Sequence, residues 1–170
     1  MLKLVENNKK QQKRKNYIVL AESFYLNNNK NKAVESYEKA LVFNGCKEED
    51  ISILFNIAMI YDELGNPIES LKTYRKIIDL DEDIAGAYYG IAIIKEQLDS
   101  IDEALEYYYK AIEKDSEYDR AYYFAANLHD KKGEIHKAME LYKKVIKLAP
   151  DDFYAYNNLG SLYEEIGLYD

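Results

Sequence analysis

The chain has 170 residues, 48% of them hydrophobic and 32% charged, so it is long enough for one compact domain or a short solenoid that folds in water. No apolar run approaches the ~18 residues that span a bilayer, and the first ten residues lack the hydrophobic stretch of a secretory signal. Cys46 is the only cysteine, which excludes an internal disulfide and favours a reducing, cytoplasmic location.

Charge is unevenly distributed. The net charge is −8, but residues 1–15 hold six Lys or Arg against one Glu, about +5, which leaves about −13 on the rest. The acidic remainder of the chain repels a phosphate backbone, which argues against nucleic acid as the main partner. We also expect no membrane partner. Residues 1–13 are interpreted as a basic extension, either solvated or in contact with the acidic surface of a neighbouring copy.

Scarce proline and glycine favour an all-helical chain, and self-comparison gives a period of 34 residues. In chain order the blocks are 14–47, the extra residues Glu48-Glu49-Asp50, then 51–84, 85–118, 119–152 and a partial block, 153–170. Each block predicts two antiparallel helices, in the second block at about 50–64 and 67–80. The acidic clusters are expected on loops and polar helix faces.

When the blocks are aligned, residues at the same position of each block form a column, and several columns hold one kind of residue. Two columns hold only small residues: the eighth (Ala21, Ala58, Ala92, Ala126, Gly160) and the twentieth (Ala33, Ser70, Ala104, Ala138). Small side chains let two helices approach closely, so both columns are predicted to lie where the helices of a block cross. The fifteenth column reads Asn28, Gly65, Asp99, Gly133 and Gly167, residues that tolerate the left-handed backbone of a helix C-cap.

The partial block carries Tyr156, Leu159-Gly160, Tyr163 and Gly167, and the preceding block carries Ala138, Tyr142 and Pro150. This pattern resembles the tetratricopeptide repeat over residues 14–170. The resemblance implies a right-handed α-solenoid of four full repeats and the first helix of a fifth. His129 and Lys95 replace the family's tyrosine, and we expect both to loosen local packing.

A search for chemistry gives no catalytic residue, metal site or cofactor. A turn separates His129 from His136, no second cysteine accompanies Cys46, and no glycine-rich phosphate loop is present. His129 is interpreted as a packed core residue and His136 as solvated. Enzymatic function is therefore not expected.

The resemblance places a peptide groove on the first helices of the repeats. The predicted floor is apolar and aromatic: Ile18, Phe55, Met59, Tyr89, Ile93, Tyr123 and Asn127. The predicted rim is acidic: Glu22, Asp62, Glu63, Glu96, Asp130 and Glu164. Such a groove suits a protein or peptide partner with apolar anchors and basic residues between them, and makes the chain a protein-interaction scaffold.

Two alternatives stay open. The chain could be a regulatory or targeting appendage of a larger enzyme or signalling protein whose activity lies outside this segment. It could also self-assemble, through the open fifth block or the basic extension. The family's clamp for acidic chaperone tails needs Lys and Asn in the fifth and ninth columns, where this chain has Phe55 with Met59 and Tyr89 with Ile93. Binding of such a tail is therefore disfavoured.

Overall fold

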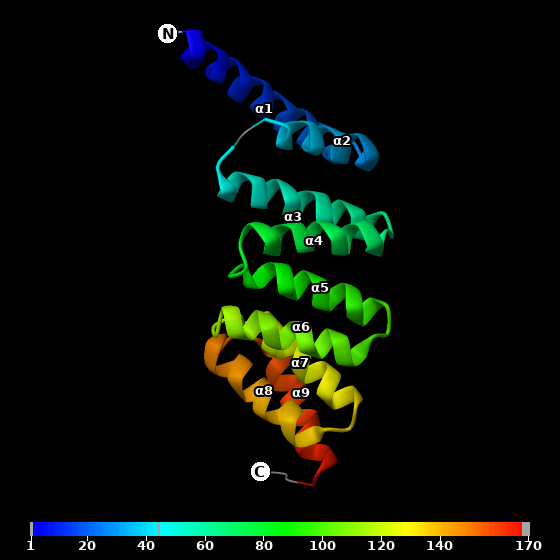
Figure 1. The fold of residues 1–170 in the computed structure, drawn as a ribbon. Coiled ribbons are helices and arrows are strands. Elements are labelled where there is room, and N and C mark those ends of the chain that lie inside the picture. The colour runs from blue at the N-terminus through cyan, green and yellow to red at the C-terminus, as the bar shows by residue number, and fades with distance from the viewer. Residues whose placement is uncertain (1, 44, 168–170) are drawn as a thin grey trace. The chain divides into compact units, whose positions relative to one another are not determined.

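The computed structural model describes residues 2–43 and 45–167, with side chains from residue 6 onward. Residues 168–170, the end of the partial fifth block, lie outside the described residues. All regular structure in the described ranges is α-helical, which confirms the predicted all-α fold of helix–turn–helix repeats (Figure 1). The chain divides into an N-terminal unit, residues 1–82, and a C-terminal unit, residues 83–170.

The N-terminal unit consists of two helical hairpins. Its helices are α1 (Leu2–Leu26), α2 (Lys30–Leu41), α3 (Lys47–Glu63) and α4 (Pro67–Leu80). The second hairpin has nearly the predicted bounds, but α3 begins at Lys47 rather than near residue 50. Glu48, Glu49 and Asp50 therefore form the first turn of α3 rather than a loop. Carboxylates are stabilising there because a helix N-terminus carries partial positive charge.

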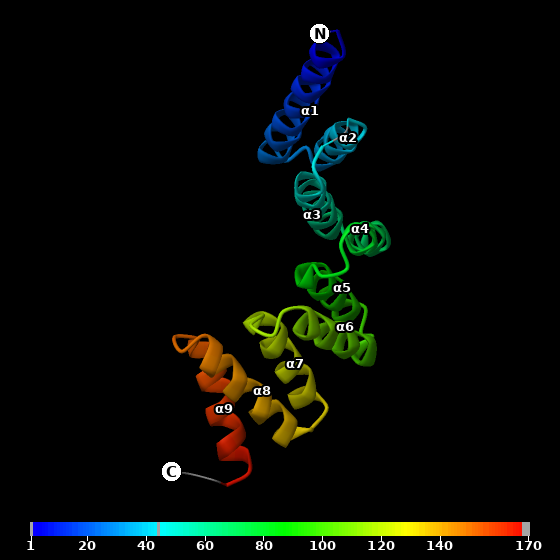
Figure 2. The same ribbon diagram turned by 60° about the vertical axis from the view of Figure 1, so that its left-hand side comes forward.

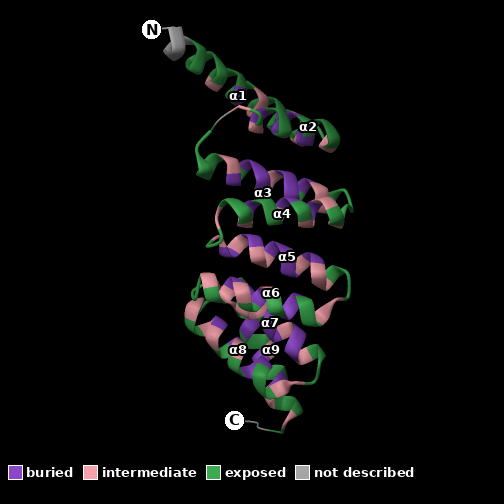
Figure 3. Cartoon of the chain, in the orientation of Figure 1, coloured by how far each residue is buried: buried purple, intermediate pink, exposed green. Residues whose placement is uncertain are grey.

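The C-terminal unit consists of two hairpins and a single last helix. Its helices are α5 (Ala85–Gln97), α6 (Ile101–Lys114), α7 (Asp119–Lys131), α8 (Ile135–Leu148) and α9 (Phe153–Glu165). Two views show the helices of each hairpin side by side (Figures 1 and 2). Buried residues lie along the sides of the helices that pack, and exposed residues along the others (Figure 3).

The turns inside the hairpins share one geometry. All five residues of the fifteenth column have positive φ, from 57° at Asn28 and Asp99 to 71° at Gly133 and Gly167, as predicted. In each of the four complete turns the next amide donates to a carbonyl five residues back, for example Asn66 to Tyr61 at 2.9 Å. This bond is the signature of a Schellman cap, which ends the first helix and starts the second within three residues.

The small columns form the contact between the helices of a hairpin. Every member of the eighth and twentieth columns from Ala21 to Ala138 is fully buried. Ser70 on α4 also donates its hydroxyl to the carbonyl of Ala58 on α3 at 2.9 Å. Gly160 on α9 differs, because it is exposed and a Cβ built on it would meet nothing within 4 Å. The four hairpins thus share a close crossing, and α9 presents the matching position to solvent.

A buried arginine ties the first hairpin to α3. Arg14 on α1 is 1% exposed and donates to the carbonyls of Ala40 (3.2 Å) and Phe43 (2.7 Å). It also donates to the carboxylate of Asp50 on α3 at 2.5 Å. A Cβ at residue 45 would overlap the guanidinium, so the closeness of Arg14 requires Gly45.

Candidate functional site

The predicted floor residues of the N-terminal unit lie on α1 and α3. Ile18 is half-buried and packs against the core that α1, α2 and α3 share. Phe55 meets the ring of Tyr74 on α4 edge-on, with centroids 6.0 Å apart, and Met59 is 43% exposed. These positions give the N-terminal unit a limited apolar surface.

The predicted rim of the same unit is partly neutralised from within. Glu63 accepts a hydrogen bond from the Tyr25 hydroxyl at 2.7 Å and lies 3.1 Å from the ammonium of Lys30. These two partners hold the pKa of Glu63 below its usual value. Asp62 is half-buried, and Glu22 is exposed. Glu63 is thus already engaged, whereas the charge of Glu22 faces solvent.

The floor of the C-terminal unit is a connected group of aromatic rings. Tyr89 on α5 contacts Tyr108, Tyr118 and Phe124 at centroid distances of 5.9, 5.3 and 5.9 Å. Tyr123 on α7 meets Phe124 edge-on at 5.5 Å and Tyr142 on α8 at 5.9 Å. Edge-on rings gain stabilisation beyond their buried area, so this group joins α5, α6, α7 and α8. Tyr108 and Tyr142 are fully buried, and Tyr89, Tyr123 and Phe124 are half-buried. Ile93 packs beside it, half-buried.

Amides and phenols join α7, α8 and α9 next to these rings. The Tyr142 hydroxyl donates to Oδ1 of Asn127 at 2.5 Å. Nδ2 of Asn158 on α9 lies 3.3 Å from that same oxygen, 3.1 Å from the Tyr142 hydroxyl and 3.3 Å from that of Tyr123. The network brings Tyr123 and Asn127, two predicted floor residues, to one polar centre. The repeat columns gave no signal for Asn158, because its column was not assigned to the groove.

Burial controls the protonation of these phenols. It raises the pKa of Tyr89 to about 12 and that of Tyr142 to about 12, and also raises the pKa of Tyr108. Desolvation disfavours the phenolate, and the Tyr108 and Tyr142 hydroxyls donate hydrogen bonds to Glu96 and Asn127.

The predicted rim of the C-terminal unit is uneven. Glu96 on α5 accepts a hydrogen bond from the Tyr108 hydroxyl at 2.9 Å and pairs with Lys131 at 3.3 Å. Asp130 is half-buried at the end of α7, and Glu164 is exposed on α9. Glu96 therefore orients a buried phenol in addition to carrying charge at the edge of the floor.

His129 is a packed core residue, as predicted. The ring is 5% exposed, with Nε2 2.7 Å from the Tyr109 hydroxyl and Nδ1 2.8 Å from a Glu134 carboxylate oxygen. Both ring nitrogens therefore have partners, and the histidine links α6, α7 and the loop before α8. At the equivalent position Lys95 pairs with Glu103 at 2.6 Å, which joins α5 to α6. His136 is exposed, as predicted.

Within the described ranges, no group of three or more His, Cys, Asp or Glu side chains is arranged to hold a metal ion. None of the described helices combines the length and apolar character needed to cross a lipid bilayer.

Comparison with family models decides the family. A model described as tetratricopeptide repeat matches residues 51–84 and 85–118, and a model described as TPR repeat matches residues 126–167. The chain belongs to the tetratricopeptide repeat family. A search of curated proteins gives no significant match.

Solved tetratricopeptide structures resemble the chain along most of its length. A crystal structure of MamA is 26% identical, with a TM-score of 0.75, and the match covers 93% of this chain and 85% of MamA. YrrB, a TPR protein with an unusual peptide-binding site, is 21% identical with a TM-score of 0.66, over 84% and 72%. The first TPR of Spaghetti (RPAP3), bound to an HSP90 peptide, is 20% identical with a TM-score of 0.65, over 70% and 97%. The last two similarities show the fold.

In tetratricopeptide terms, Tyr89, Tyr123 and Asn158 lie on the first helices of three consecutive repeats, α5, α7 and α9. Together they place aromatic faces beside amide groups. Such a surface can pack against apolar side chains and exchange hydrogen bonds with a peptide main chain.

Proposed function

We propose that the chain is a non-catalytic scaffold that binds a peptide segment of a partner protein on the first helices of its repeats. The observation that carries this proposal is the aromatic and amide surface of the C-terminal unit, formed by Tyr89, Tyr123, Asn127 and Asn158. Membership of the tetratricopeptide family supports it, as do the peptide-binding site of YrrB and the HSP90 peptide bound to the first TPR of RPAP3. We further propose a cytoplasmic location, where the exposed Cys46 stays reduced.

The partner segment is proposed to be basic with apolar anchors. Apolar side chains would lie against the rings of Tyr89 and Tyr123, which are half-buried and hence reachable. Lys or Arg between the anchors would face the carboxylates of Asp130 and Glu164, which form no ion pair with another described residue. The α1 and α3 positions Ile18, Phe55 and Met59, with Glu22 beside them, are proposed as a second, smaller contact surface.

A peptide library tests the site. The double variant Tyr89→Ala, Tyr123→Ala should lose at least tenfold in affinity for the selected peptides, because central aromatic contacts carry most of the binding energy. A matched control, Tyr154→Ala with Tyr156→Ala, removes two tyrosines of α9 that are 69% and 50% exposed and lie outside the predicted floor. Because the floor tyrosines also pack internally, Asn127→Ala provides a milder second variant, and circular dichroism checks that each variant is folded. Equal binding by the parent and the folded Tyr89/Tyr123 and Asn127 variants would move the site elsewhere.

Self-association through the exposed face of α9 is a second proposal. It is supported by the exposed faces of Phe153 (72%) and Tyr154 (69%) on α9 and by the open position at Gly160. Light scattering of the parent and of a Phe153→Ser, Tyr154→Ser variant would test it. A parent that stays monomeric up to high concentration excludes this proposal.

A further inference from the structure

The first helix extends well past its own hairpin. Helix α1 has 25 residues and α2 has 12. The bonds from Arg14 to the carbonyls of Ala40 and Phe43 place the end of α2 beside residue 14 of α1. The preceding residues of α1, from Leu2 to Lys13, therefore run about 18 Å beyond the hairpin at 1.5 Å per residue.

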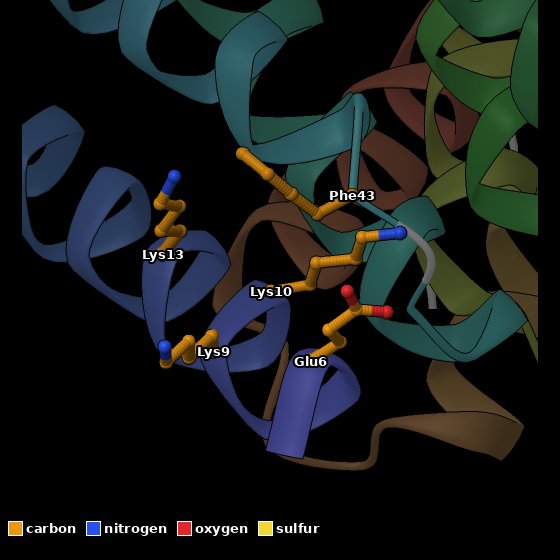
Figure 4. A pocket seen from close by; sticks show the side chains of 5 residues that line it. All are labelled: Glu6, Lys9, Lys10, Lys13 and Phe43. Atoms are coloured by element: carbon orange, nitrogen blue, oxygen red, sulfur yellow. The ribbon is translucent and has the colours of Figure 1, made fainter. Parts of the chain in front are cut away.

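One face of this overhang is basic and continues the packed face of the hairpin. Glu6, Lys9, Lys10 and Lys13 recur at the three- and four-residue spacing of a single helix face. One turn further on, Tyr17 stacks against Phe43 with centroids 6.0 Å apart and planes at 17°. The overhang thus brings Lys10 close to the segment that carries Phe43, whereas Lys9 points away from it (Figure 4).

These side chains line a shared cavity. Glu6, Lys9, Lys10, Lys13 and Phe43 surround a volume of about 330 Å³ (Figure 4). In the figure, Lys10 and Glu6 reach toward the segment of Phe43, which follows α2. Lysine stems and the phenyl ring provide an apolar base, and the ammonium groups provide charge around it.

Among the described residues, no carboxylate lies at ion-pair distance from the lysines of the cavity. Ten other lysines lie within 4 Å of a carboxylate, yet no such pair includes Lys9, Lys10 or Lys13 among the described residues. All three are exposed, and Glu6 is the single carboxylate in the cavity. Three exposed like charges around an apolar base favour a partner that supplies both carboxylates and an apolar side chain.

We infer that the α1 overhang and Phe43 form a docking surface for an acidic peptide segment of a partner protein, with one apolar side chain placed against Phe43. This surface is distinct from the peptide site proposed above. A phosphate backbone fits less well, because it has no apolar group to place against Phe43 and the lysine stems.

The experiment uses the full chain and a fluorescent peptide in which four Asp or Glu residues flank one Leu. Fluorescence anisotropy at low salt should show binding that weakens as salt rises, because exposed charges are screened. The variant Lys9→Gln, Lys10→Gln, Lys13→Gln should lose about tenfold or more in affinity. The control variant Arg75→Gln, Lys76→Gln, Lys147→Gln removes the same charge from exposed positions on α4 and α8 and should bind like the parent. Phe43→Ala, checked for folding by circular dichroism, should remove the preference for Leu over Gly at the centre of the peptide.

Several outcomes would overturn the inference. One is equal binding by the two lysine variants, and another is equal binding of a peptide with Asn and Gln in place of the acids. A single-stranded oligonucleotide that binds as tightly as the acidic peptide would make the surface a nucleic-acid site. Dimers of the parent that the Lys9/Lys10/Lys13 variant abolishes would make a second copy the occupant. By contrast, unchanged binding of the acidic peptide by the Tyr89→Ala, Tyr123→Ala variant would support the inference, because it would show that this surface and the proposed groove are different sites.

Discussion

At the scale of single residues, Arg14 has the least exposed side chain among the charged residues described. Its guanidinium donates to the carbonyl of Phe43 and to that of Ala40, which also accepts from the Phe43 amide at 3.1 Å. The same group pairs with carboxylates in the first turn of α3. One side chain thus joins three helices, and it can do so because Gly45 leaves room for it.

We predict that Arg14→Ala lowers the free energy of unfolding by about 2–3 kcal/mol, because it leaves buried polar groups without their charged partner. Lys15→Ala, an exposed neighbour, should change it by less than about 0.5 kcal/mol. Urea unfolding measures both values. Equal midpoints for the two variants would contradict a structural role for Arg14.

The dependence on Gly45 can be measured separately. Gly45→Ala should destabilise the parent, because the added Cβ overlaps the guanidinium, and should do so much less in the Arg14→Ala background. A double-mutant cycle by urea unfolding gives the coupling energy between the two sites. Additive effects would show that the two residues do not interact.

Sequence patterns give little information at this scale. Arg14 occupies the first column of its block, and an arginine does not indicate burial, because its contacts depend on the loop between α2 and α3. His129 departs from the family pattern, and the sequence alone does not reveal that Tyr109 and Glu134 supply partners for both of its ring nitrogens. Asn158 was missed for the same reason: its role is defined by three neighbours on α7 and α8.

At the scale of helices, the sequence was far more informative. The small eighth and twentieth columns and the fifteenth-column turns repeat at fixed spacing, and the structure shows both features in every complete hairpin. These features are local, since each depends on contacts within about twenty residues. The assignment of groove residues in different repeats to one peptide site depends on more distant relations, and it stays a prediction.

Ala104→Leu and Ala138→Leu should each reduce the free energy of unfolding by about 1–3 kcal/mol, because both positions are fully buried where two helices cross. Gly160→Ala offers a contrast within the eighth column. Its Cβ would meet open space in the middle of α9, so this change should stabilise the chain by up to about 1 kcal/mol. Thermal or urea unfolding of the three variants checks the order, and a stable Ala104→Leu protein would remove the twentieth column from the core.

At the scale of the whole molecule, buried phenols couple stability to alkaline pH. Tyr89 and Tyr142 have a folded-state pKa of about 12, above the ordinary value of 10.0. Between these values the unfolded chain loses protons that the folded chain retains. The contribution of these tyrosines to stability is therefore complete below pH 10 and declines as pH rises to about 12.

We accordingly expect the urea midpoint to fall more steeply above pH 10 in the parent than in a Tyr89→Phe, Tyr142→Phe variant. The variant keeps the rings but has no phenol to ionise at these two positions. Denaturation series at pH 8, 9, 10 and 11, with tyrosinate absorbance as a second signal, measure the difference. Parallel curves would mean that other groups control alkaline unfolding.

The shared turn geometry also affects how the chain reaches its folded state. Each cap reverses the chain within three residues, so the main contacts of a hairpin join residues close together in sequence. Little loop entropy is lost before such contacts form, and folding of chains with low contact order is correspondingly fast. A hairpin such as α3–α4 can therefore form while later hairpins are still being synthesised, so the growing chain exposes only its newest helix to the risk of aggregation.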